Sequence, residues 1–219
     1  MAYVLGFIYA DGSIYPSERG KYTTVMSTDK PIIFKIKKWL ESGHTIREEN
    51  PPGNRKQRFT LRIGNKELYE SLKGLGLYPS KSLTVKLPNI PAKYFKDFLR
   101  GYFDGDGCVH IYRSKGIKQK IILRKLTVIF TSGSKKFLQE LLAKLREKLE
   151  LRQDKIYNSQ RSFQLRLATK DSVEVFKFMY SNINPETMLG RKFKVFHEYF
   201  KLRPVRVDKK VENILVSTK

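Results

Sequence analysis

The sequence predicts an α+β protein built from two similar halves. A helical segment that ends in Asp-Gly occurs twice, at residues 4–12 and at residues 99–107. After each copy the chain repeats one order of elements, namely hairpin, helix, hairpin and helix, with apolar and polar residues alternating along the strands. We therefore expect two pseudo-symmetric αββαββα halves with antiparallel sheets. The expected boundaries are a first half at 1–87, a linker at 88–92, a second half at 93–203 and a basic tail at 204–219.

Both copies of the repeated helix carry small residues four positions apart. They are Gly6 and Ala10 in the first copy, and Gly101 and Gly105 in the second. Residues four apart share one helix face, so we expect the two helices to pack closely through these faces. Asp11 and Asp106 follow, each before a glycine that suits the left-handed turn of many helix ends. Such packing would bring two carboxylates together, which suits a divalent metal, although Asp-Gly is also a common turn signal.

The remaining elements of the first half follow from composition and spacing. Residues 13–27 have the composition of a hairpin, and Pro31 lies near the start of a helix expected at 30–41. A second hairpin is expected at 44–63. A helix at 66–74 then closes the half.

The second half repeats this order with about eight extra residues in its first hairpin, where Gly116 is the expected turn. Its middle helix is expected at 134–149, with leucines on one side and lysines on the other. The last helix is expected at about 186–201. The tail beyond Pro204 receives no assignment from the sequence.

The chain is strongly basic and has a globular composition. Its 219 residues include 44 Lys and Arg against 21 Asp and Glu, a net charge of +23. This charge favours nucleic acid as the partner and an anionic membrane less, and no apolar run approaches the roughly 20 residues of a membrane span. Cys108 is the only cysteine, so the sequence predicts a reducing intracellular compartment, the cytoplasm or an organelle matrix.

The duplicated Asp-Gly helix, in two similar halves, resembles the motif of LAGLIDADG homing endonucleases in their single-chain form. The resemblance covers residues 3 to about 201. It implies a monomer whose two sheets form a DNA-binding saddle, with the motif helices packed at the interface. The implied activity is hydrolysis of both strands of double-stranded DNA across the minor groove, with Mg²⁺ or Mn²⁺ as cofactor.

The resemblance also assigns roles to single residues. Asp11 and Asp106 match the motif acids that hold the metal and carry catalysis. Lys81 and Lys192 occupy places where the family has a basic residue that polarises water or stabilises charge on the phosphate, and solvated surface charge is the alternative. The less specific matches are Asp104, interpreted as structural, and two polar residues expected to position water, Ser27 and Thr131.

Polar side chains on the outward faces of the two sheets form the expected DNA surface. Arg and Gln can read base edges in the major groove, whereas each residue alone could be an ordinary solvent-facing side chain. The set is Ser13, Tyr15, Arg58, Thr60, Arg62, His110, Tyr112, Arg113, Lys120, Gln164 and Arg166.

Other functions remain open at this point. Binding of structured RNA by a group I intron maturase and non-catalytic DNA binding by a regulator of the same fold are the two alternatives. Both motif acids are present, which argues against the regulator. The three histidines are dispersed without ligand spacing, which disfavours zinc.

Overall fold

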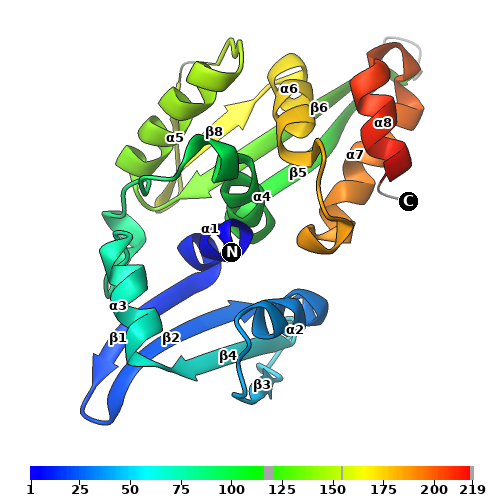
Figure 1. Cartoon of the computed structure of the whole chain (residues 1–219). Coiled ribbons are helices and arrows are strands. Elements are labelled where there is room, and N and C mark those ends of the chain that lie inside the picture. Colours follow the sequence, from blue (N-terminus) through cyan, green and yellow to red (C-terminus); the bar gives the residue numbers. More distant parts are fainter. Residues whose placement is uncertain (116–120, 154, 218–219) are drawn as a thin grey trace. The chain divides into compact units, whose positions relative to one another are not determined.

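The computed structural model describes residues 1–115, 121–153 and 155–217, which divide into two compact units, 1–105 and 106–219 (Figure 1). Gly116 and Lys120 lie outside the described residues. Within the described ranges, the strands form two four-stranded antiparallel sheets, one in each unit. The predicted α+β class with two antiparallel sheets is confirmed.

The first unit has a sheet with the strand order β1-β2-β4-β3, and α1, α2 and α3 all contact its strands. Its elements are α1 (Ala2–Asp11), β1 (Gly12–Ser17), β2 (Gly20–Ser27), α2 (Lys30–Trp39), β3 (Ile46–Glu49), β4 (Arg58–Gly64), α3 (Lys66–Gly74), the short 3₁₀ helices η1 (Lys81–Leu83) and η2 (Ala92–Tyr94), and α4 (Phe95–Asp106) up to Gly105.

Local sequence explains where these elements begin and which face they bury. Asn65 caps α3, because its side-chain oxygen accepts a hydrogen bond of 2.8 Å from the backbone N–H of Leu68. Pro31 stands in the first turn of α2, where its missing N–H costs nothing. Along β4 the core residues Phe59 and Leu61 are buried, whereas their neighbours face outward.

Helices α1 and α4 touch through their backbones. A Cβ atom added at Gly6 would overlap the carbonyl oxygen of Phe98 and lie 2.8 Å from the nitrogen of Tyr102. A Cβ atom added at Gly101 would overlap the carbonyl oxygen of Tyr3. Only glycine therefore permits this approach at either position.

The expected left-handed turn at the helix ends is wrong. Gly12 has φ −108° and ψ 161°, so α1 passes straight into β1, and Gly107 is the first residue of β5. Among the described glycines, the left-handed ones lie elsewhere, at Gly20, Gly53 and Gly76. Gly12 is instead required by close approach, because a Cβ atom there would lie 2.6 Å from the carbonyl oxygen of Ile8.

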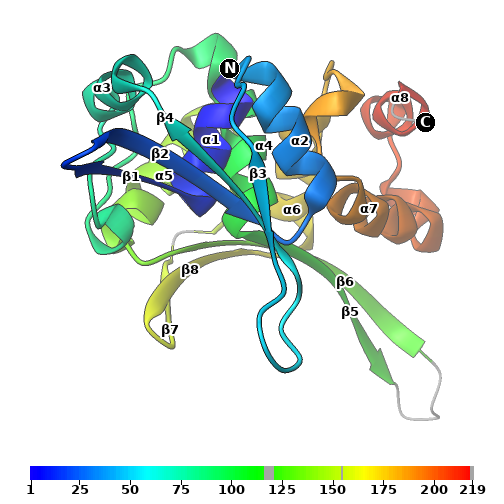
Figure 2. The same cartoon turned by 90° about the horizontal axis from the view of Figure 1, so that it is seen from below.

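The second unit has the strand order β5-β6-β8-β7. Helices α5, α6 and α7 contact its strands and lie on one side of them in Figure 2. Helix α8 contacts α6. Its elements are β5 (Gly107–Lys115), β6 (Ile121–Ser132), α5 (Lys135–Lys148), β7 (Tyr157–Ser159), β8 (Ser162–Leu167), α6 (Thr169–Tyr180), η3 (Pro185–Thr187), α7 (Gly190–Leu202), η4 (Pro204–Arg206) and α8 (Lys209–Ser217).

The first hairpin of this unit is the longer one, as the sequence offsets predict. Strands β5 and β6 have 9 and 12 residues, against 6 and 8 in β1 and β2. The pairing of β5 with β6 shifts between Ser114 and Lys115. The ordered ladder therefore extends further in the second unit than in the first.

In the C-terminal region one prediction needs correction, and the tail, which the sequence left unassigned, contains a helix. The last predicted helix is interrupted, because Pro185–Thr187 form a separate 3₁₀ turn and α7 starts only at Gly190. The tail contains the helix α8, and Asp208, just before its start, accepts at Oδ1 a hydrogen bond of 2.9 Å from the Val211 N–H. Val211 and Ile214 are buried, so this helix is part of the second unit's core.

Candidate functional site

Asp11 and Asp106 are the last residues of α1 and α4. Asp11 is exposed, and its Oδ2 lies 3.3 Å from where a Cβ atom of Gly105 would stand, one residue before Asp106 in the chain. Neither helix has a basic residue in its last turn. Carboxylate oxygens are the ligands that a hard divalent cation prefers, so each of these two residues has the chemistry of a metal ligand.

Lys81 and Lys192 are buried lysines, 6% and 4% exposed. Lys81 Nζ donates a 2.9 Å hydrogen bond to the Tyr9 carbonyl oxygen, two residues before Asp11. In the second unit, Lys192 Nζ donates a 2.5 Å hydrogen bond to the Gly107 carbonyl oxygen, one residue after Asp106. Each unit thus holds an ammonium group at the chain segment that carries its motif acid. Neither lysine is solvated surface charge.

The first acid position of the motif is occupied by Asp104 in α4 and by Tyr9 in α1, and both side chains are buried. Asp104 Oδ2 accepts a hydrogen bond of 2.7 Å from the Tyr3 hydroxyl. Tyr9, at the matching position of α1, donates from its hydroxyl to the Leu75 carbonyl oxygen at 2.5 Å, and burial raises the pKa of this hydroxyl. Asp104 therefore connects α4 to α1, and Tyr9 connects α1 to the end of α3.

The outward face of the first sheet carries an aromatic and cationic cluster. Tyr15 and Tyr22 stack with ring centres 5.5 Å apart, and the guanidinium carbon of Arg62 lies 4.1 Å from the Tyr22 ring centre. Ser13, Arg58 and Thr60 also avoid the core. Tyr22 was not predicted from the sequence, although the alternation with buried Thr23 and Val25 in β2 contains the necessary signal.

The outward face of the second sheet has a related arrangement. The guanidinium carbon of Arg166 lies 5.3 Å from the ring centre of Tyr157, and its Nε donates to Gln164 Oε1 at 2.8 Å. His110 and Tyr112 are exposed on β5. This face therefore presents fixed polar and aromatic groups.

Arg113 stands apart from these outward residues. It alternates with His110 and Tyr112 along β5, and its guanidinium pairs with Glu198 of α7, a helix that contacts β5. The structure therefore directs Arg113 to the helix-covered side of the sheet, although the sequence analysis grouped it with the outward set.

The two proposed water-positioning residues are not equivalent. Ser27 Oγ accepts a hydrogen bond of 3.1 Å from the Asp29 N–H before α2. The matching bond in the second unit is made by Ser132, whose Oγ accepts from the Ser134 N–H at 3.1 Å. The strand pairing also makes Ser132 the counterpart of Ser27, because Ser27 pairs with Phe59 of β4 and Ser132 pairs with Phe163 of β8. Thr131 is half-buried opposite Gln164.

Within the described residues, no group of three or more His, Cys, Asp or Glu side chains is arranged to hold a metal ion. A two-carboxylate site, as predicted, falls below that number. None of the helices in the described ranges has the length and apolar character needed to cross a bilayer.

The comparisons with known proteins agree with the motif. Residues 96–178 match the LAGLIDADG-like domain family. Three similar solved structures are the LAGLIDADG meganuclease I-AabMI bound to uncleaved DNA, the homing endonuclease I-WcaI bound to its DNA recognition sequence, and I-SmaMI bound to an uncleaved DNA target in the presence of calcium ions. No curated protein matches the sequence.

The structural similarity extends over nearly the whole chain at low sequence identity. I-AabMI has a TM-score of 0.61 at 12% identity, covering 97% of this chain and 95% of its own. I-WcaI has a TM-score of 0.60 at 16% identity, covering 89% of this chain and 84% of its own. I-SmaMI has a TM-score of 0.59 at 13% identity, covering 99% of this chain and 97% of its own. The chain has the fold of these endonucleases, and the resemblance stated from its two motifs is confirmed.

Proposed function

We propose that this protein is a site-specific endonuclease that hydrolyses both strands of double-stranded DNA with a divalent metal. The observation that carries the proposal is the arrangement repeated in the two units. In each, a buried lysine donates to a backbone carbonyl within two residues of a helix-ending aspartate. A single Asp-Gly turn would not require such a repeated lysine.

Asp11 and Asp106 are the residues that would hold the metal. When bound, a divalent ion supplies an activated water and stabilises the departing oxygen of the phosphodiester. Mg²⁺ or Mn²⁺ fits a site of this kind, because both accept a few carboxylate oxygens completed by water and phosphate. I-SmaMI was solved with DNA in the presence of calcium ions, which supports a divalent-ion site.

Lys81 and Lys192 would contribute fixed positive charge. Because each ammonium is held on a backbone carbonyl, it needs no reorganisation when negative charge develops on a phosphate nearby. We assign both lysines to charge stabilisation and to polarisation of the attacking water. Burial keeps bulk water from screening them.

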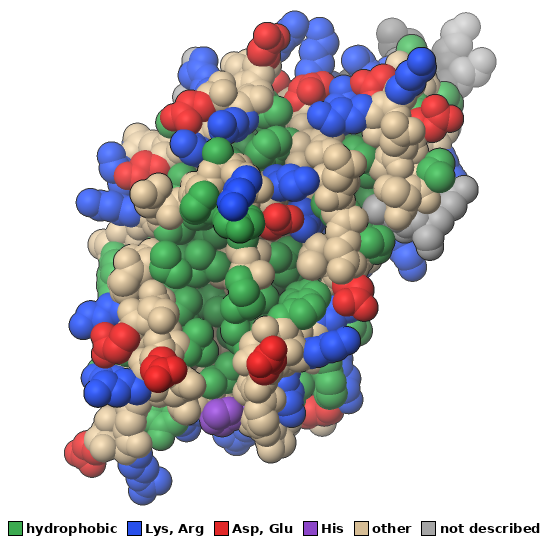
Figure 3. All heavy atoms as spheres, in the orientation of Figure 1, with side chains coloured by type: hydrophobic (Ala, Val, Ile, Leu, Met, Phe, Trp, Pro, Cys, Tyr) green, Lys and Arg blue, Asp and Glu red, His purple; other side chains and the backbone are tan. Residues whose placement is uncertain are grey.

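The outward sheet faces would bind the DNA. In the neighbouring proteins, DNA is the bound partner, and the basic composition of this chain suits a polyanion. Lys and Arg side chains are spread over the face shown in Figure 3. Arg62, Gln164 and Arg166 have the side chains that read base edges in the major groove. We exclude Arg113 from this set because it pairs with Glu198.

The test is cleavage of a randomised duplex library with Mg²⁺, followed by sequencing of the cut ends and assays on the selected site. Asp11→Asn and Asp106→Asn should each suppress double-strand cleavage while DNA affinity stays within a few-fold, because an amide holds metal poorly but leaves the sheet faces intact. Glu70→Gln, on the exposed side of α3, is the matched control and should cut normally. Normal cleavage by both aspartate variants would contradict the proposal.

A further inference from the structure

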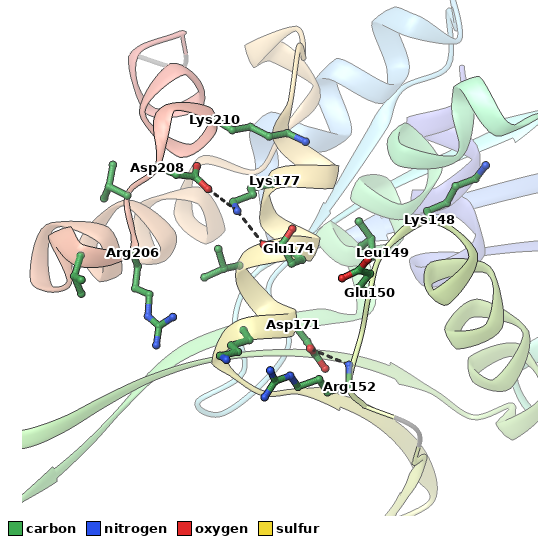
Figure 4. A pocket seen from close by; sticks show the side chains of 14 residues that line it. Lys148, Leu149, Glu150, Arg152, Asp171, Glu174, Lys177, Arg206, Asp208 and Lys210 are labelled. Carbon is green, nitrogen blue, oxygen red and sulfur yellow. Dashed lines mark hydrogen bonds and ion pairs between the residues drawn. The ribbon is translucent and has the colours of Figure 1, made fainter.

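The second unit has a large basic groove on the helix-covered side of its sheet. Its volume is about 800 Å³, and it lies between α6, the segment after α5, and the η4–α8 region (Figure 4). The charged residues that line it are Lys148, Glu150, Arg152, Lys170, Asp171, Glu174, Lys177, Arg206, Asp208 and Lys210.

The acidic side chains of this groove are largely used by internal contacts. Lys177 Nζ lies 2.9 Å from Glu174 Oε1 and 2.7 Å from Asp208 Oδ2. Asp171 is buried and accepts hydrogen bonds of 3.1 and 2.9 Å from the backbone N–H groups of Arg152 and Gln153. Three of the four acids are therefore neutralised or held by protein groups, and Glu150 is the fourth.

The basic side chains are left with a surplus. Within the described residues, five of the six lining cations form no ion pair with a carboxylate, and Lys177 is the exception. The five are Lys148, Arg152, Lys170, Arg206 and Lys210. In Figure 4, Arg152 extends from the segment after α5 and Arg206 from the segment before α8, so the cations come from more than one wall of the groove. The groove therefore carries excess positive charge after its internal pairs are counted.

The acidic side chains that form these internal contacts also hold the walls of the groove in place. Asp171 holds the segment that carries Arg152, and the Lys177–Asp208 pair holds the start of α8, which carries Lys210. Asp208 also caps α8 through Val211. The cations are thus presented from walls that need not reorganise on binding.

The lining also indicates which part of an anionic ligand would be bound. Apart from the charged residues, the described lining consists of Leu149, Val173, Val205 and Val207, with no aromatic ring on which a base could stack. The groove is much larger than one phosphate. We propose that it binds the phosphate backbone of a nucleic acid, without reading its sequence, as a second contact besides the outward sheet face.

This second contact lies on the side of the sheet covered by α6, whereas Gln164 and Arg166 face away from the core of the same sheet. The strand bound in the groove would therefore be a separate segment from the duplex on the outward face. The inference goes beyond the proposed cleavage activity and does not depend on it.

The test measures binding of fluorescent 20-nucleotide single-stranded RNA and DNA to the full chain as salt rises from 50 to 200 mM. The triple variant Lys170→Glu, Arg206→Glu, Lys210→Glu removes cations from three elements. Each lost phosphate contact should lower the slope of log affinity against log salt by about 0.7, so three should lower it by about 2. Over this fourfold salt range, three contacts account for roughly 20-fold in affinity.

The matched control reverses three exposed cations of the same unit outside the groove, Lys135, Lys194 and Lys201. Its slope should stay close to that of the parent. If both triple variants lower the slope equally, binding depends on the overall charge of the protein and the proposal is overturned. It is also overturned if neither variant lowers the slope. The milder variant with Gln at 170, 206 and 210 should give the same slope change, and it decides the matter if the charge-reversed protein does not fold.

Two further readouts separate the sources of phosphate and the two functions. If inorganic tripolyphosphate occupies the groove while the nucleic-acid slopes of parent and groove variant coincide, the ligand is a free phosphate and the proposal is wrong. Cleavage of the selected duplex should be unchanged in the groove variant. If the Asp11→Asn test fails, the groove result therefore still stands. If the groove test fails, the cleavage result still stands.

Discussion

The Tyr3 hydroxyl donates a hydrogen bond of 2.7 Å to Oδ2 of Asp104, joining two helices across 101 positions of the chain. Both residues are buried, and the guanidinium carbon of Arg100 lies 5.7 Å from the Tyr3 ring centre. At Gly6 and Gly101 the two helices meet through backbone atoms, and such contacts slide more easily than a directional hydrogen bond. The pair therefore fixes how far α1 lies along α4.

Replacing Tyr3 with Phe should destabilise the protein by about 1.5 to 3 kcal/mol, because a buried carboxylate loses a donor while the ring remains. Thermal or urea unfolding measures the loss. Tyr78→Phe is the control, since its hydroxyl bonds Thr84 at an exposed position and should cost well under about 1 kcal/mol. Equal losses in the two variants would show that the Tyr3 bond has no special weight.

Gly6→Ala should destabilise by at least about 1 to 3 kcal/mol, because the new methyl group meets the backbone of α4 rather than a movable side chain. Gly74→Ala is the matched helical control. Nothing lies within 4 Å of a Cβ atom there, so alanine should be neutral or stabilising by up to about 1 kcal/mol. Similar unfolding midpoints for the two variants would contradict the backbone contact.

Lys81→Met and Lys192→Met should each slow strand cleavage by about 10²-fold, the usual cost of losing one charge-stabilising group, with little change in DNA affinity. Single-turnover rates measured at saturating protein separate the two effects. Lys86→Met controls for a lysine of the same segment that is exposed. If affinity falls and the single-turnover rate does not, the lysines act in binding and our assignment is incorrect.

Arg62→Ala should relax base preference at one position of the target and cost about 1 to 3 kcal/mol of discrimination. Arg113→Ala should leave base preference unchanged, because this guanidinium pairs with Glu198 on the other side of its sheet. Sequencing of sites selected from a randomised library reads both variants. A lost preference in Arg113→Ala would place that residue back on the DNA surface.

The attachment of α8 should depend on pH in the acid range. Burial would raise the pKa of Asp208, but hydrogen bonds from Lys177 and the start of α8 outweigh it and hold this pKa below its ordinary value of 3.8. The stabilisation is therefore present above pH 3.8 and is lost as the pH falls through the lower, folded value. Burial would lower the pKa of Lys177, but its bonds to Asp208 and Glu174 raise it above 10.5, so its contribution is lost only in strong alkali.

Asp208→Asn should remove this acid dependence. Between about pH 5 and pH 3, the thermal midpoint of the parent should fall more steeply than that of the variant, because only the parent has this carboxylate to protonate. Methyl NMR signals of Val211 and Ile214 report the same change locally, since both side chains are buried in α8. Parallel curves for parent and variant would rule the linkage out.

Much of the fold could be predicted because the local signals agree with the tertiary structure. The helix predicted at 66–74 is α3, with Asn65 as its cap. Arg58 and Thr60, predicted to face outward, alternate along β4 with the buried Phe59. The small residues of the motif helices indicated a close contact, and Gly6 and Gly101 now show which backbone atoms it involves. These features depend on neighbours in sequence or on a repeated pattern.

Other features depend on contacts that spacing does not reveal. Gly12 suggested a left-handed turn, but its backbone is extended, and the residue is glycine because a Cβ atom there would collide with the Ile8 carbonyl oxygen. Burial of Lys81 depends on the carbonyl of Tyr9, 72 positions away. The tail helix did leave a signal that the sequence analysis did not use, since Asp208 precedes Val211 and Ile214 at helical spacing.

The direct passage from helix to strand has a mechanical consequence. α1 ends at Asp11 and β1 begins at Gly12, and α4 ends at Asp106 just before β5 begins at Gly107. No loop residue stands between either aspartate and the strand that follows it, so there is no slack at these two joints. If the proposed function holds, a strand that tilts as it enters a DNA groove would move the adjoining carboxylate with it. A poorly fitting DNA sequence would then displace the groups proposed to hold the metal.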